Sequence, residues 1–461
     1  MIYFVCFVVI YLLYVLLKLN VWICIALGVY AFLMVPFYQK RTRKIQEYQQ
    51  RFYDVSLYLD TILYAFVKEE KVEPAVRDVR QALPDGKMKT VVEMAHDYLV
   101  MTYDEVELLE ESLSLIDREY PCKRVHDVHK FMTHVEYYGG EIEKPVRLLL
   151  EDKGRWEQRI KQEMQNRKKQ LLDVVLSVVA SIVICSAVIY LPVMDVDISR
   201  EWMLQILALL VIVANTQILF WAQKYLEVDW IGLQLHEEEE YYRKKMLEYE
   251  NYDEEGQKRL SLGLGVIAML GTGIAFCVGN QVLTMLGLLA TLFFGNQHKI
   301  GKGLLERNLR REIAYAFPNW LLDMVLLLQS ENVQVSLEKS KEFVPGVLRK
   351  ELHHLIEELK INPESAEPYH GFLKSFEIPE VYSAMGILYS ISIGNSGNAD
   401  KQISELVEKN LELLDVTEKD MLRRQANGMQ VLFLLPVLTA SLKLMADMVV
   451  LMLRFLDTPF L

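Results

Sequence analysis

The chain has 461 residues, of which 52% are hydrophobic, and it carries a formal net charge of −12. Its apolar share exceeds that of an average soluble domain and is concentrated in blocks, which indicates a membrane protein. Phosphate binding needs a basic stripe, so the acidic balance argues against nucleic acid as a partner. The five cysteines have no paired spacing, and the sequence therefore predicts neither a disulfide framework nor a metal site.

The chain opens with an apolar hairpin, residues 1–38, in which the runs 2–17 and 21–38 predict membrane spans. The first run lacks the basic start and cleavage site of a signal peptide, so we expect it to remain as an anchor. A polar block follows at 39–170. Its helical periodicity predicts six helices, at 52–68, 73–82, 87–101, 104–117, 123–138 and 142–170.

Two further apolar runs predict a second hairpin, and the charged stretch after it predicts a helical linker, because opposite charges lie four residues apart. A third hairpin, a second polar block and a last membrane segment complete the chain. These parts are the hairpin 171–222 with runs 171–192 and 203–222, the linker 223–258, the hairpin 259–297 with runs 261–279 and 281–295, the block 298–428, and the segment 429–461 with the run 430–453.

The second block also predicts a series of short helices and no strand. They lie at 320–328, around Val335 to Phe343, and at 348–361, 371–376 and 381–393, and a long amphipathic helix starts near 399 and runs into the last span. The predicted fold class is an all-α membrane protein with about seven transmembrane helices and two related cytoplasmic six-helix bundles.

Basic clusters beside the spans predict the orientation, because Lys and Arg near a span resist translocation. Placing all four clusters on one side puts both polar blocks and the linker in the cytoplasm, the amino terminus inside and the carboxyl terminus outside. The stretch Leu191–Arg200 then faces out. We expect a multi-pass protein of the inner, or cytoplasmic, cell membrane; the clusters are Gln39–Lys44, Arg167–Lys169, Lys299–Arg311 and Arg423–Arg424.

The two blocks share local sequence. Tyr137–Lys144 aligns without a gap on Gly394–Lys401, which pairs Gly140 with Gly397, and one apolar helical face follows in both copies. At the start of the blocks, a gap of about two residues brings Val72 to Val333. We interpret the chain as a diverged internal repeat.

No pattern in the chain predicts catalysis. Gly295–Gly303 superficially resembles a phosphate loop, but its glycine spacing is one residue too long and Gly303 stands where Ser or Thr would hold magnesium. The histidines are interpreted as surface side chains without metal partners. We therefore expect no catalytic residue, no cofactor and no metal; the histidines considered are His126, His129, His353 and His354.

The paired helical blocks, each with a Gly-rich turn before a helix that continues into a span, resemble the type II secretion system F-domain family. This family comprises the inner-membrane platform proteins of type II secretion and of type IV and tight-adherence pili, and the chain resembles two tight-adherence platform subunits fused together. The turns here contain Gly139, Gly140, Gly394, Ser396 and Gly397. Many family members have an acid in this turn, where Tyr137 and Gly394 stand instead.

The resemblance implies a non-enzymatic platform that couples a hexameric secretion ATPase to the assembly of pilin or pseudopilin subunits, as a homo-oligomer. The Gly-rich turns would then be candidate coupling elements. Lys443 and Asp447 lie four residues apart inside the last span, where unpaired charge is costly, so we expect an ion pair. Contact between Lys443 and an acid of a pilin helix, and a re-entrant hairpin broken at Lys443, are alternatives.

A multi-span transporter with internal repeats is the alternative function, since such proteins carry buried charge at mid-membrane.

Overall fold

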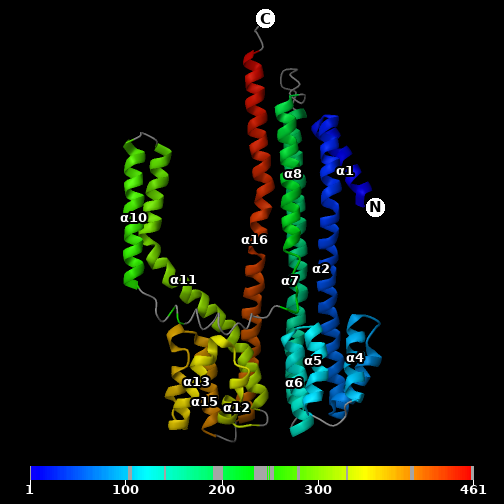
Figure 1. Ribbon diagram of the computed structural model, residues 1–461, viewed down its shortest axis with the longest axis vertical. Helices are drawn as coiled ribbons and strands as arrows, with labels where there is room; N and C mark the ends of the chain where they lie inside the picture. The colour runs from blue at the N-terminus through cyan, green and yellow to red at the C-terminus, as the bar shows by residue number, and fades with distance from the viewer. Residues whose placement is uncertain are drawn as a thin grey trace. The chain divides into compact units, whose positions relative to one another are not determined.

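The computed structural model describes residues 2–101, 106–139, 142–190, 201–232, 247, 249, 254–277, 281–328, 331–394 and 399–457, and within these ranges all regular structure is helical (Figure 1). The helices form two compact units. The first unit is Met1–Tyr137, Leu149–Gln234 and Lys419–Leu461, and the second is Tyr138–Leu148 and Leu235–Glu418. The helical fold class is thus confirmed for the described residues.

The first polar block contains the helices that its periodicity predicts. The one difference is at its start, where the second span and the first helix of the block form a single helix, α2, because 39–51 is rich in good helix formers. The helices are α2 (Val21–Glu69), α3 (Val72–Ala82), α4 (Lys87–Met101), α5 (Val106–Glu119), α6 (Lys123–Tyr138) and α7 (Glu143–Tyr190).

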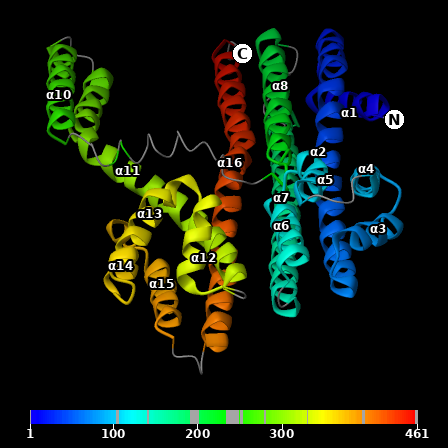
Figure 2. The ribbon, with the colours of Figure 1, turned by 60° about the horizontal axis from the view of Figure 1, so that its bottom comes forward.

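The apolar part of the first unit combines helices from both ends of the chain. Besides α2 and α7 it contains α1 (Ile2–Leu17), α8 (Trp202–Lys224) and the second half of α16 (Ala399–Asp457). Within this unit α2, α7, α8 and α16 run side by side (Figures 1 and 2). Residues from several of these helices meet in one apolar cluster: Leu13, Leu27, Cys185, Ile212 and Ala440.

The second unit packs its helices around an aromatic core. Trp320 is fully buried and stacks on Phe372 with ring centroids 5.8 Å apart. Phe317 and Tyr369 are buried in the same cluster. The helices are α10 (Glu254–Cys277), α11 (Gln281–Leu327), α12 (Val333–Lys339), η2 (Ser340–Glu342), α13 (Gly346–Ile361), α14 (Glu367–Gly371), η3 (Lys374–Phe376), α15 (Pro379–Ser392) and the first half of α16.

Four helices in the described part of the chain are long and apolar enough to cross a membrane. They contain the second, third, fourth and last of the seven expected spans. Two shorter apolar helices, Tyr3–Leu17 and Thr284–Phe294, coincide with the first and sixth, and α10 covers most of the fifth. The structure is therefore that of a membrane protein with four candidate spans.

The last span is not a hairpin. Helix α16 continues without a break to Asp457 and passes through Lys443, so the alternative of a re-entrant turn at that residue is wrong. Pro436 lies inside the helix, where its ring removes one main-chain donor and crowds the carbonyl four residues earlier, but α16 is not interrupted there.

Candidate functional site

The Gly-rich turns have the same backbone geometry in both blocks. Gly139 follows α6 with φ +70°, and Gly394 follows α15 with φ +74°. Both values lie in the left-handed region that favours glycine at the end of a helix. Gly140, Ser396 and Gly397, the other predicted turn residues, lie outside the described residues.

This geometry changes the alignment within the turn. The gap-free alignment pairs Gly394 with Tyr137, whereas the positive φ pairs it with Gly139. Between the helices there are four residues, 139–142, in the first block and six residues, 393–398, in the second. Two extra residues therefore lie in the second turn, and the helices on either side keep their correspondence.

The second helix of each block presents a buried stripe with identical spacing. In α3 the buried residues are Val72, Ala75, Val76 and Val79, and in α12 and η2 they are Val333, Ser336, Leu337 and Ser340. Both sets follow i, i+3, i+4 and i+7, which forms one helical face. The sequence alignment pairs Val72 with Val333. In the structure both residues are buried, and each is the first residue of the second helix of its block.

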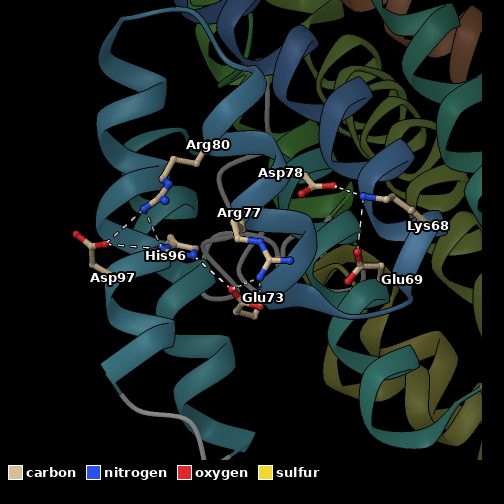
Figure 3. A network of polar contacts seen from close by, with 8 residues as sticks. All are labelled: Lys68, Glu69, Glu73, Arg77, Asp78, Arg80, His96 and Asp97. Atoms are coloured by element: carbon tan, nitrogen blue, oxygen red, sulfur yellow. Dashed lines mark hydrogen bonds and ion pairs between the residues drawn. The ribbon is translucent and has the colours of Figure 1, made fainter.

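An ion pair and polar contacts of a histidine connect α3 to the helices on either side of it (Figure 3). Lys68 of α2 contacts Asp78 at 3.0 Å. The mostly buried His96 of α4 lies 3.3 Å from the Arg80 guanidinium and 3.4 Å from the Glu73 carboxylate. These contacts connect the polar side of α3 to α2 and α4.

Lys443 and Asp447 form the ion pair that their spacing predicts. The ammonium lies 2.5 Å from the carboxylate, and both side chains are almost fully buried. Removing either partner would leave an unpaired charge in an apolar surrounding. Because the pair is closed off, Lys443 does not face outward, where another chain could contact it.

Polar contacts continue from this pair along α7, α8 and α16. Asn215 donates to Ser181 at 3.1 Å and accepts from Thr439 at 3.0 Å. Ser177 donates to the carbonyl of Phe433 at 2.8 Å, one turn before Pro436. Hydrogen bonds of this kind hold helices together where hydrophobic surfaces give little preference for one neighbour.

Arg167 joins three segments of the first unit just outside its apolar part. It is 1% exposed. Its guanidinium contacts the Glu163 carboxylate at 2.9 Å, the carbonyl of Tyr225 at 2.8 Å and the carbonyl of Leu422 at 3.2 Å. It also lies 5.0 Å from the ring centre of Trp230, within cation–π range. We call these contacts the Arg167 junction.

From the sequence, Arg167 was predicted only as one of the basic residues beside a span. If the alignment of Tyr137–Lys144 with Gly394–Lys401 is continued without a gap, Arg167 falls on Arg424, which is exposed and pairs with Asp420 on its own helix.

The segment that follows α8 is not helical, and ion pairs hold it against α2. Positions 226–232 contain no helix, which corrects the expected helical linker over this part. Glu227 pairs with Arg41 at 3.3 Å and with Lys44, and Asp229 pairs with Arg51 at 2.8 Å. The basic cluster after the second span therefore binds this segment to α2.

The interpretation of His129 as a surface side chain is wrong. It is 3% exposed, and its ring lies 2.7 Å from the Tyr58 hydroxyl and 2.8 Å from the Asp117 carboxylate. His126 contacts the same carboxylate at 3.1 Å. Burial alone would raise the pKa of Asp117, but the hydrogen bonds from both histidines outweigh it and lower that pKa to about 2.

Among the described residues, no group of three or more His, Cys, Asp or Glu side chains is arranged to hold a metal ion. The buried polar groups described above mostly join helices to one another. Comparison of the chain with protein-family models, curated protein sequences and solved structures found no match.

Proposed function

We propose that this protein is a non-enzymatic inner-membrane platform of a type II secretion or tight-adherence-like pilus machine. It would couple a hexameric cytoplasmic ATPase to the assembly of pilin or pseudopilin subunits, as a homo-oligomer with both polar blocks in the cytoplasm. The topology of seven spans and the internal repeat are themselves part of what we propose.

The observation that carries the proposal is the repeated helix order. In each block a long helix from an apolar segment is followed by a short helix with the same buried stripe, then by three more helices, a turn with a left-handed glycine, and a helix that continues into an apolar segment. Two such blocks resemble two platform subunits in one polypeptide.

Continuous helices support the mechanical role. Helices α2 and α7 extend from the first block into apolar segments without interruption, and α16 does so from the second. A helix of about 50 residues is about 75 Å long and moves as a rod over short distances. A displacement imposed on a block would reach the membrane through these rods, a rigid-body change.

Affinity purification of the full chain from its native membrane in mild detergent, with partners identified by mass spectrometry, tests the proposal. We expect a secretion ATPase together with pilin-like proteins. Their reproducible absence, with a purified chain that moves a small solute in liposomes, would instead support the transporter.

The transporter remains the second candidate because of the buried Lys443–Asp447 pair and the polar contacts around Asn215. Cysteine scanning of α7, α8 and α16 separates the two functions. A continuous row of water-accessible positions through the apolar part would favour transport, whereas inaccessible positions support a packed structural bundle.

A further inference from the structure

The second block contains a groove on its surface. It lies between α13 and α14 and has a volume of about 350 Å³. Leu355 and Phe372 line it with side chains that are each only 2% exposed, and Ile361 beside them is 86% exposed. An isoleucine this exposed on a polar block is costly to leave in water.

The length of one helix explains why the groove is open. In the first block, α5 has 14 residues and covers α4, where Ser112 donates to the carbonyl of Ala95 at 2.7 Å and Tyr98 contacts Glu111 at 2.9 Å. The helix at the same place in the second block, α14, has only five residues. The end of α13 therefore lacks the cover that a full helix would provide.

The charge of the groove indicates what could complete it. Glu351, Glu358 and Glu367 line it, and the one basic group in the lining, His354, lies 3.3 Å from Glu358. A helix that packed an apolar face against the exposed Ile361 would bring its flanking residues to these carboxylates. Lysine or arginine at those positions would be complementary, and acidic residues would be repelled.

We propose that the groove between α13 and α14 binds a basic amphipathic helix from a protein partner, which takes the place that α5 occupies in the first block. This is helix-in-groove recognition, with apolar anchors at i, i+3, i+4 and i+7. The inference rests on the described residues of the second block and is independent of the proposed role in pilus assembly.

The chain offers a matched pair of variants for the test. Glu357 and Glu358 are neighbours on α13, and each pairs with a histidine four residues earlier, at 3.2 Å and 3.3 Å. Only Glu358 lines the groove. Glu358→Lys and Glu357→Lys therefore make the same change in charge and lose the same kind of surface pair, but only the first alters the groove.

The experiment measures peptide binding to the full chain in nanodiscs of neutral phosphatidylcholine, with empty nanodiscs as background. The probe is a fluorescent peptide of about 16 residues, about four helical turns, with leucine anchors and lysine flanks. Two control peptides are compared with it: one with glutamate flanks and one with a scrambled sequence. We expect the lysine peptide to bind at least about tenfold more tightly than either, with an affinity that falls as salt rises.

Glu358→Lys should weaken binding of the lysine peptide at least about tenfold, and Glu357→Lys should change it less than about twofold. Ile361→Asp, at a side chain too exposed to matter for folding, should also weaken it. Equal loss in the two lysine variants, an unchanged affinity in Ile361→Asp, or equal binding of the three peptides would overturn the proposal.

Discussion

At the scale of single residues, a buried arginine is tolerated only when its donors find acceptors. Arg167 meets this condition with one carboxylate and the carbonyls of Tyr225 and Leu422. Arg167→Ala would leave Glu163 without its partner and both carbonyls without this donor, so we expect a loss of about 3–5 kcal/mol in stability. The midpoint of thermal unfolding of the solubilised chain measures it.

The control for this variant is Arg155→Ala on the same helix. Arg155 pairs with Glu151 at 2.8 Å, but their side chains are 34% and 48% exposed, and ion pairs in contact with solvent contribute between zero and about 1 kcal/mol. Equal shifts of the unfolding midpoint for the two variants would mean that the Arg167 junction does not hold the first unit together.

The pair of His126 and Asp117 predicts a pH dependence. The hydrogen bond to Asp117 raises the pKa of His126 above its usual value of about 6.5. The contribution of His126 to stability is therefore fully present below about pH 6.5 and is lost as the pH rises through the raised pKa. The contribution of Asp117 is present above about pH 4 and is lost as the pH falls toward its lowered pKa of about 2.

His126→Asn should consequently destabilise the chain most between about pH 4 and pH 6.5, and the difference from the unaltered chain should shrink above that range. Unfolding midpoints measured across pH test this. Asp127 and Lys130 also act on the pKa of His126, so the same series is measured in an Asp127→Asn, Lys130→Gln background, which leaves Asp117 as the charged partner of His126 named here. A difference that stays constant with pH would contradict the assignment.

Residues were predictable where their partners are close in the sequence. Lys443 and Asp447 lie on one face of one helix, so their spacing alone predicts the pair. The partners of Arg167 include a carbonyl 255 residues away, and main-chain carbonyls leave no mark in a sequence. His129 was misjudged for the same reason, because Tyr58 lies 71 residues before it.

At the scale of elements, the turns before α7 and α16 depend on glycine. An alanine at Gly139 would hold a side chain at φ +70°, which costs about 1–2 kcal/mol. Gly139→Asn should cost less, because asparagine adopts this conformation more readily. Thermal unfolding of both variants measures the order.

The control is Gly154→Ala in the middle of α7, where an added Cβ would meet nothing within 4 Å. This change should stabilise the chain by about 0.5–1 kcal/mol, since glycine weakens a helix interior. If alanine at Gly139 proved equally stabilising, the left-handed turn would not be part of the native structure.

Helices α10 and α11 pack closely at one glycine. A Cβ at Gly287 would lie 2.5 Å from the Thr272 hydroxyl and 3.1 Å from its Cα, so Gly287→Ala should force the two helices apart. Spin labels at Leu270 and Leu288, which are both exposed, should then show a longer mean distance. Gly271→Ala, where a Cβ meets nothing within 4 Å, should leave the distance unchanged.

The helices themselves were largely predictable, because short amphipathic helices separated by Pro, Gly or Asn signals leave a clear periodicity. The boundaries of α3, α4 and α6 agree with expectation within one residue. The prediction of two separate helices in place of α2 was wrong, because a polar stretch rich in helix formers fits a continuous helix and a connection between two helices equally well. It also missed the docked segment after α8, which is held by residues of another helix.

At the scale of the whole molecule, the first unit is built from both ends of the chain. Residues 419–461 belong with the first hairpins, although the sequence assigned them to the second copy of the repeat. The contacts of Ser177 and Asn215 with α16 explain this, because they bind the last helix to α7 and α8. Local sequence similarity between the two blocks therefore does not decide which compact unit a helix joins.

The proposed platform role requires both polar blocks on the side of the ATPase, and labelling of single cysteines tests that requirement. In a chain whose own five cysteines are replaced by alanine, Ile361→Cys and Val416→Cys place thiols at exposed positions of the second block, 86% and 65% exposed. A maleimide that does not cross membranes should label them only after the cells are opened. Asp195→Cys, in the stretch expected to face outward, should be labelled in intact cells.

Ile361 and Val416 are both exposed. If a cysteine at either position does not react in intact cells, the cause is therefore its side of the membrane and not its burial. Val416 also lies outside the groove of α13 and α14, so a bound partner there would not mask it. Labelling of Val416→Cys in intact cells would place the second block outside. A cytoplasmic motor could then not reach it, and the platform proposal would fail whatever the repeat resembles.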